Sequence, residues 1–162
     1  MVESVTTAGD SLAMKVVKYW LPVLLMIVAM YYFSTDVLSG ENTRSFIEEI
    51  LGWLGYNITP RTAERLNYIT RKAAHFIEYA ILAALLFRAF RADSIMRWRL
   101  RWAVYSFFVA AAWALLDEYH QTFTHDRTGS IKDSMLDSAG ALFMLIVIAV
   151  FNYRKNRKQA AL

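Results

Sequence analysis

Residues 139–151 read AGALFMLIVIAVF, and none of these side chains is polar. A helix that crosses a bilayer needs roughly 20 mostly apolar residues, and residues 131–151 together reach that length. In lipid the backbone must satisfy its hydrogen bonds within its own segment, so this run predicts a transmembrane helix.

Three more apolar blocks lie upstream, at residues 16–33, 73–90 and 100–116. The chain has 162 residues, 57% of them hydrophobic, and no linker or internal repeat divides it. We therefore predict an all-α membrane protein, a single domain over residues 1–162 that forms a bundle of four transmembrane helices. Cysteine is absent, which excludes disulfides, thiolate metal sites and a cysteine nucleophile.

A shorter amphipathic helix is expected between the first two blocks. Residues 45–48 read SFIE, which fits a capping box beginning at Ser45, and apolar residues follow on one face. Gly52 and Gly55 mark its expected end. Thr59 and Pro60 then fit the cap and first turn of a helix that can continue into the second apolar block.

The positions of lysine and arginine predict the orientation. Basic residues precede the first block, join the second to the third and follow the fourth, so they fall on one side of a four-helix protein. Since basic loops stay in the cytoplasm, we expect a multi-pass protein of the bacterial cytoplasmic (inner) membrane with both termini cytoplasmic and the amphipathic helix extracytoplasmic. The net charge of +4 lies beside apolar blocks, not along a solvated face, so no nucleic-acid partner is expected.

Ionisable side chains inside a bilayer are costly, and they usually face the bundle interior or a wet cavity. The first such group lies in RKAAHFIEY at residues 71–79, where Arg71, His75 and Glu78 share one helical face. Lys72 and Tyr79 flank that face. Of these, Tyr79 is expected to be a packing or interfacial aromatic.

Two further polar groups lie at one end of the third and fourth predicted helices. They comprise Asp117, Glu118 and Gln121 within the motif DEYHQ, and Arg127, Ser130, Asp133 and Asp137 ahead of Gly140. At about 1.5 Å per residue, His75, Asp117 and Asp137 lie about 20–25 Å from the basic ends of their helices, in a hydrocarbon core about 30 Å thick. Because three helices agree on this depth, the sequence predicts one polar pocket that opens outward.

At these residues the sequence resembles the VanZ-like family of small bacterial membrane proteins. The resemblance rests on RKAAHFIEY, on DEYHQ and on RTGSIKD at residues 127–133, and it covers about residues 71–151. Asp137 stands where we expect asparagine in many members. The namesake of the family is associated with resistance to teicoplanin, a lipid-tailed glycopeptide that acts at the outer membrane face. The resemblance implies a cell-envelope role linked to glycopeptide resistance, and it supplies no agreed reaction.

The residue types suit a membrane-embedded enzyme that acts on a lipid-linked or amphiphilic envelope substrate. The expected catalytic residues are His75, Glu78, Asp117, Glu118 and Asp133. The expected substrate-binding residues are Lys72, Gln121, Arg127, Ser130 and Asp137. Histidine titrates near neutral pH and suits general acid–base work, while lysine and arginine suit an anionic group such as phosphate. The sequence has no nucleotide-binding loop and no HExxH motif, so no cofactor is expected, and spacing alone does not motivate a metal site.

Two other hypotheses stay open at this point. The same pocket could bind or exclude a lipoglycopeptide or a lipid without any chemistry. Alternatively, the polar residues could hold the helices of a structural, partner-binding protein together. Membrane lipids or a lipid-linked envelope precursor are the expected partners, and the sequence leaves a homo-oligomer open.

Overall fold

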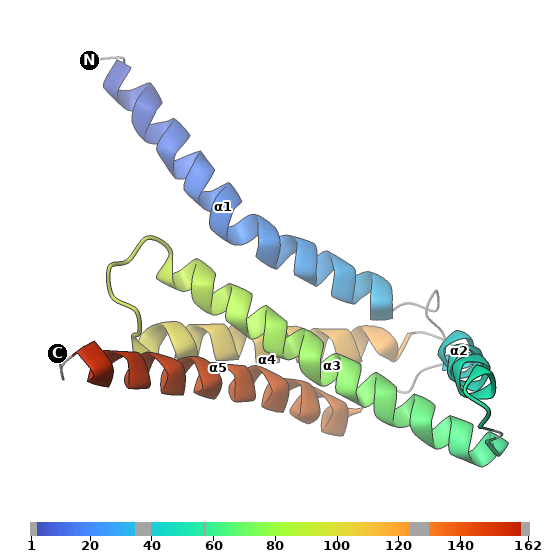
Figure 1. The fold of residues 1–162 in the computed structure, drawn as a ribbon. Coiled ribbons are helices and arrows are strands. Elements are labelled where there is room, and N and C mark those ends of the chain that lie inside the picture. The colour runs from blue at the N-terminus through green and yellow to red at the C-terminus, as the bar shows by residue number, and fades with distance from the viewer. Residues whose placement is uncertain (1–2, 35–39, 57, 124–129, 160–162) are drawn as a thin grey trace.

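The computed structural model describes residues 3–34, 40–56, 58–123 and 130–159. This part of the chain forms five helices, which are α1 (Glu3–Ser34), α2 (Gly40–Trp53), α3 (Pro60–Arg91), α4 (Leu100–Gln121) and α5 (Ile131–Gln159). Four of them, α1, α3, α4 and α5, are long and apolar enough to cross a membrane. The predicted all-α fold, with four spans and a short helix between the first two, is confirmed (Figure 1).

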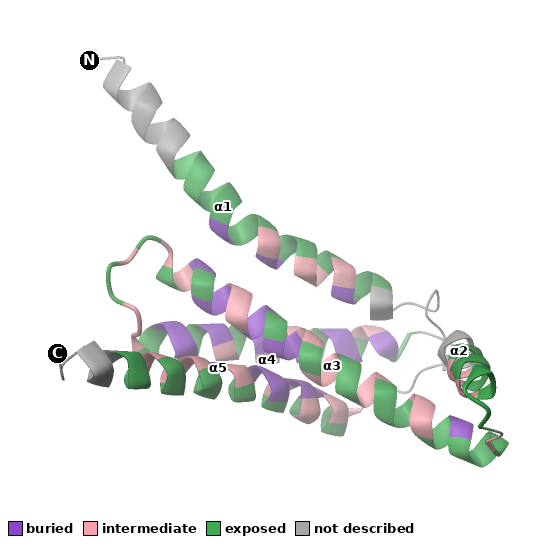
Figure 2. Cartoon of the chain, in the orientation of Figure 1, coloured by how far each residue is buried: buried purple, intermediate pink, exposed green. Residues whose placement is uncertain are grey.

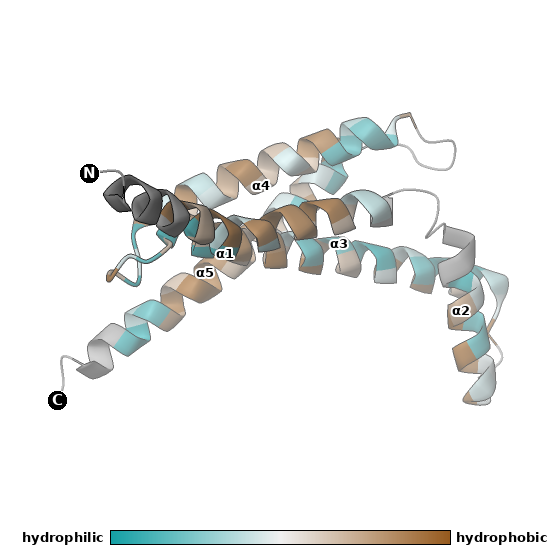
Figure 3. Ribbon diagram, turned by 90° about the horizontal axis from the view of Figure 1, so that it is seen from above, coloured by the Kyte–Doolittle hydropathy of each residue, from teal (hydrophilic) through white to brown (hydrophobic). Residues whose placement is uncertain are grey.

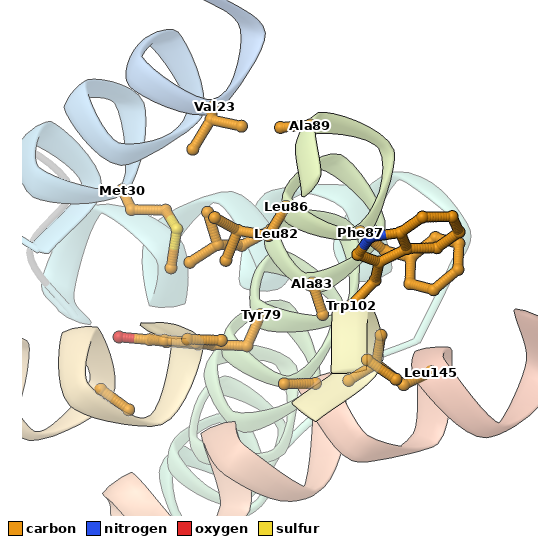
Figure 4. Close-up of a cluster of buried hydrophobic side chains, with 14 of the residues drawn as sticks. Val23, Met30, Tyr79, Leu82, Ala83, Leu86, Phe87, Ala89, Trp102 and Leu145 are labelled. Carbon is orange, nitrogen blue, oxygen red and sulfur yellow. The ribbon is translucent and has the colours of Figure 1, made fainter. Parts of the chain in front are cut away.

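Helix α3 is the centre of the bundle, since it packs against α5, α4, α1 and α2. The apolar core lies where α3, α4 and α5 meet, and it includes Leu82, Leu86, Trp102 and Leu145 (Figure 4). Burial is concentrated on the facing sides of these three helices, while their outer faces are exposed (Figure 2). Exposed apolar residues fill the middle of α4 and α5, as expected of surfaces that face lipid (Figure 3).

The two ends of the bundle differ. The N-terminal end of α1, the C-terminal end of α5 and the α3–α4 connection lie together at one end, and α2 lies at the other (Figure 1). The three basic regions of the sequence therefore share an end, as a four-span topology requires. At the α2 end α3 projects past α4 and α5 (Figure 1), and its 32 residues give a helix of about 48 Å.

Helices α3 and α5 approach closely where Gly140 faces Phe76. A Cβ atom at position 140 would lie 3.0 Å from the carbonyl carbon of Phe76 and 3.1 Å from its Cα atom. Small residues at helix–helix crossings in membranes allow the two backbones to come this near. The crossing therefore depends on glycine at position 140.

Helix α1 is attached to the bundle by few buried residues. Tyr19, Val23 and Met30 join the core, while most of its other described side chains are exposed. At the basic end Tyr19 donates a hydrogen bond to Asp93 in the α3–α4 connection. The ammonium groups of Lys15 and Lys18 lie 3.4 and 3.7 Å from the carboxylate oxygens of Asp93. These contacts fasten α1 to the connection between α3 and α4.

This attachment is expected to weaken in acid. The hydrogen bond from Tyr19, followed by the neighbouring Lys15 and Lys18, lowers the pKa of Asp93 below its ordinary 3.8. A carboxyl whose pKa is lower in the folded state stabilises the fold at pH values above its unfolded pKa. That contribution to stability is lost as the pH falls through the folded pKa. We expect Asp93→Asn to remove this acid-sensitive contribution to stability. The thermal midpoint of the variant should therefore fall less between neutral pH and about pH 3 than that of the unaltered protein. Circular dichroism in detergent measures the midpoint. An equal fall of the midpoint in acid for the variant and the unaltered protein would contradict the expectation.

Two of the predicted helix boundaries are confirmed by their caps. Thr59 caps α3, and its hydroxyl accepts a hydrogen bond of 3.3 Å from the backbone N–H of Thr62. After α2, Gly55 adopts a φ of 82°, which favours glycine, and the N–H of Tyr56 donates to the carbonyl of Leu51. Helix α3 runs unbroken from Pro60 through the second apolar block.

Other boundaries differ from the prediction. The capping box at Ser45 is wrong, because α2 begins at Gly40 and Ser45 lies inside it. The first helix begins at Glu3 rather than at residue 16, and the last two continue to Gln121 and Gln159. Polar turns extend each apolar block, since a helix that is already nucleated adds residues at little cost.

Candidate functional site

A group of polar side chains gathers between α3, the C-terminal end of α4 and the N-terminal end of α5. We call it the polar cluster, and its members are Lys72, His75, Glu78, Tyr79, Asp117, Glu118, Gln121, Ser130, Asp133 and Asp137. On each helix these residues recur at intervals of three or four, or stand beside one that does, which places them toward one face. Three segments distant in sequence thus contribute to one site.

An ion pair joins α3 to α5 within the polar cluster. The ammonium nitrogen of Lys72 lies 2.5 Å from Oδ1 of Asp133. The two side chains are only 22% and 29% exposed, so solvent screens the pair incompletely. The same ammonium lies 5.4 Å from the ring centroid of Tyr68, one turn earlier in α3. Lys72 is therefore already held by an anion and an aromatic face.

The C-terminal end of α4 contributes three buried residues, Asp117, Glu118 and Gln121. The amide of Gln121 donates to Oδ2 of Asp117 at 3.1 Å. Oε2 of Glu118 accepts a 2.6 Å hydrogen bond from the backbone N–H of Ser130, just before α5 begins. A carboxylate at the N-terminal end of a helix is favoured by the exposed N–H groups and the helix dipole. Glu118 therefore ties the end of α4 to the start of α5.

His75 and Glu78 form the partly exposed side of the polar cluster on α3. Nδ1 of His75 lies 3.7 Å from Oε2 of Glu78, and each side chain is 20% exposed. A histidine beside a carboxylate can accept and return a proton while the carboxylate orients the ring.

Tyr79 and Asp137 are the most deeply buried members, at 0% and 1% exposure. Within the described part of the chain, neither the Tyr79 hydroxyl nor Oδ2 of Asp137 has a hydrogen-bond partner. Both groups lie within electrostatic reach of Asp117 and Glu118. Figure 4 shows the Tyr79 hydroxyl turned away from Phe87 and Trp102. The inner part of the polar cluster therefore consists of carboxylates and one phenol.

The structure brings nearly all of the predicted site residues together. Arg127 lies outside the described residues. Tyr79 packs in the apolar core, as the sequence predicted. The place of its hydroxyl among the carboxylates was not predicted, although Tyr79 lies two turns after Lys72 and one turn after His75. Over the described ranges, no three histidine, aspartate or glutamate side chains converge so as to hold a metal ion.

An apolar groove begins beside the polar cluster, between α4 and α5. Its volume is about 340 Å³, and its walls include Phe107 and Leu115 of α4 and Met135 and Leu142 of α5. The groove also reaches Ser134 and Ser138, but their hydroxyls donate to the backbone carbonyls of Ala114 and Ser134. Because the hydroxyls are satisfied internally, the groove presents an apolar surface.

These features define a multi-span membrane protein whose three central helices enclose a polar cluster at one end. The VanZ/LLP1 family profile matches residues 19–152, which is most of the chain, and the chain belongs to that family. The resemblance read from RKAAHFIEY, DEYHQ and RTGSIKD is thereby confirmed. No significant match was found among curated proteins or among solved structures.

Proposed function

We propose that this protein binds a lipid-linked or amphiphilic compound of the cell envelope, with the headgroup in the polar cluster and the tail in the α4–α5 groove. The observation that carries the proposal is the adjacency of the two features. Ser134 lines the groove, and it directly follows Asp133 and lies one turn before Asp137. An amphiphile needs a polar site beside an apolar one, and the two features share this part of α5.

The groove suits an alkyl chain because both its walls and its surroundings are apolar. Leu115, Met135 and Leu142 are exposed on the outside of the bundle, where lipid would cover them. A tail that lies in the groove replaces lipid contacts with protein contacts, so the headgroup site supplies the selectivity.

The orientation belongs to the same proposal. The N-terminal half of α1 and the α3–α4 connection, whose flanks carry Lys15, Lys18, Arg88 and Arg101, lie at the end opposite α2 (Figure 1), and basic loops favour the cytoplasm. The polar cluster then opens toward the outer side of a bacterial cytoplasmic membrane. We expect a reporter enzyme fused after Phe90 to be active only in the cytoplasm. Export of that reporter would contradict the orientation.

We include in the proposal a role in glycopeptide resistance, which only the VanZ part of the family name supports. Teicoplanin itself carries a lipid tail, so it belongs to the class of amphiphile that the polar cluster and groove would take. Chemistry on the bound compound would use His75, which stands 3.7 Å from Glu78. His75→Gln should then abolish a resistance phenotype while amphiphile binding persists. Parallel loss of both would favour a binding protein without chemistry.

Filling the groove tests the proposal directly. We expect Ala139→Trp, on the groove wall, to lower the amount of co-purified amphiphile by about tenfold, because the indole occupies the place of the tail. Mass spectrometry of lipid extracted from the purified protein measures this amount. Ile146→Trp provides the matched control, since Ile146 is an exposed residue of α5 outside the groove. Equal amounts in the two variants would overturn the tail site.

A further inference from the structure

We propose that the headgroup site selects a positively charged amine rather than a phosphate. The reason is that the buried hydroxyl of Tyr79 and the buried side chain of Asp137 lie among the carboxylates of α4 and α5. The inference rests on the proposed amphiphile-binding function and names the chemical class of the headgroup. It reverses the expectation that Lys72 binds an anionic group.

The charge balance of the described residues favours a cation. The carboxylates of the polar cluster are Glu78, Asp117, Glu118, Asp133 and Asp137, and its basic side chains are Lys72 and His75. Lys72 is engaged by Asp133 at 2.5 Å, and His75 lies beside Glu78. A phosphate entering between α3, α4 and α5 would meet uncompensated negative charge, whereas an ammonium group would be attracted.

Hydrogen-bonding capacity leads to the same conclusion. Buried polar groups are costly unless they are paired, and Oδ2 of Asp137 and the Tyr79 hydroxyl have no partner within the described residues. A primary ammonium carries three N–H donors, and both of these oxygens can accept from it. A phosphate could accept only from the tyrosine hydroxyl, and it would face the Asp137 carboxylate. An amine therefore satisfies both groups.

The groove brings such an amine to the right place. Ser134 and Ser138 flank Asp137 on α5, and both line the groove. A tail that lies along Met135 and Leu142 runs past the turn of α5 that carries Asp137, although Asp137 itself is not part of the groove wall. The headgroup of an alkyl chain in this groove would reach the buried aspartate by entering the bundle between α4 and α5 at this turn.

A pair of probes with the same tail can test the selection. The probes are a photoreactive long-chain alkylamine and the corresponding alkyl phosphate, each with the same diazirine in the chain. The full-length protein is labelled in an uncharged polyoxyethylene detergent, and mass spectrometry locates the labelled peptides. We expect the amine to label the α4–α5 groove about tenfold more than the phosphate, which is the effect of roughly one charge-assisted hydrogen bond.

Three variants make the result specific. Asp137→Asn keeps the shape and removes the acidic group with which an ammonium can form an ion pair, so the preference for the amine should fall close to one. Tyr79→Phe removes only the hydroxyl and should reduce the preference in part. Asp93→Asn, at the opposite end of the bundle, should leave the preference unchanged, since Asp93 contacts Tyr19, Lys15 and Lys18 instead.

The outcomes separate this inference from the proposed function. Equal or greater labelling of the groove by the phosphate overturns the amine selection and leaves an amphiphile site in place. Labelling of the groove by neither probe overturns both. A preference that falls equally in Asp93→Asn and Asp137→Asn would show a general charge effect and would overturn the assignment to Asp137.

Discussion

Replacing Gly140 with alanine is expected to destabilise the bundle by about 3 kcal/mol, at the upper end of the usual cost of overpacking. The added Cβ would lie 3.0 Å from the carbonyl carbon of Phe76 and 3.1 Å from its Cα atom, so the backbones of α3 and α5 must separate. Flexible side chains can move aside, but here the obstacle is backbone. Thermal unfolding in detergent, followed by circular dichroism, should show a midpoint lower by roughly 10 °C.

The same change should also disturb the polar cluster. Phe76 follows His75 directly, and Gly140 lies one turn after Asp137. Any separation of α3 from α5 at this crossing therefore widens the distance between Lys72 and Asp133. Gly52→Ala is the matched control, because a Cβ atom at position 52 meets nothing within 4 Å. A Gly140→Ala protein as stable as Gly52→Ala would contradict the close crossing.

Removing the charge of Lys72 is expected to cost about 3 kcal/mol, near the lower end for a buried ion pair that loses one partner. The Lys72→Met protein would leave Asp133 beside Asp137 and Glu118 with no cation at 2.5 Å. The pair is about one quarter exposed, and solvent screening keeps the cost from being higher. The unfolding free energy in detergent measures the effect.

A second substitution tests whether the loss comes from the stranded aspartate. We expect Asp133→Asn in the Lys72→Met background to recover part of the stability, because the uncompensated charge is then removed. Arg44→Met is the control, since Arg44 pairs with Glu48 at 2.9 Å on exposed α2 and should contribute less than about 1 kcal/mol. If the double variant is no more stable than Lys72→Met, the loss does not arise from Asp133.

Much of the fold follows from the distribution of apolar residues. Long runs without charge predict spanning helices with little ambiguity, because lipid leaves the backbone no other partner. The caps at Thr59 and Gly55 were predictable because they depend on the conformational preferences of single residues near a helix end. The start of α2 was not, since the Ser45 motif is also compatible with a helix interior once the helix begins at Gly40. Residues 3–15 lack an apolar run, so the sequence pattern did not predict that α1 begins at Glu3.

The gathering of these polar side chains at one end of the bundle was predictable from the sequence, but their contacts were not. Counting residues from the basic ends placed His75, Asp117 and Asp137 at one level, because the helical rise is constant. Which side chains pair depends on how each helix is rotated about its axis, and periodicity does not fix that rotation. The Lys72–Asp133 ion pair and the bond from the Ser130 N–H to Glu118 therefore emerged only from the structure. Tyr79 does pack in the apolar core, as predicted, but the place of its hydroxyl among the carboxylates depends on the same rotation.

The α4–α5 groove has a consequence for how binding strength must be expressed. In a membrane its exposed walls, Leu115, Met135 and Leu142, would face hydrocarbon and not water, so a ligand of the proposed kind would reach the groove by diffusing within the bilayer. The quantity that sets occupancy is then the mole fraction of ligand among lipids. Adding empty vesicles should dilute the ligand and lower occupancy, although neither the protein nor the total ligand has changed. A compound that partitions tenfold better into the membrane would seem to bind tenfold more tightly when concentrations are referred to water.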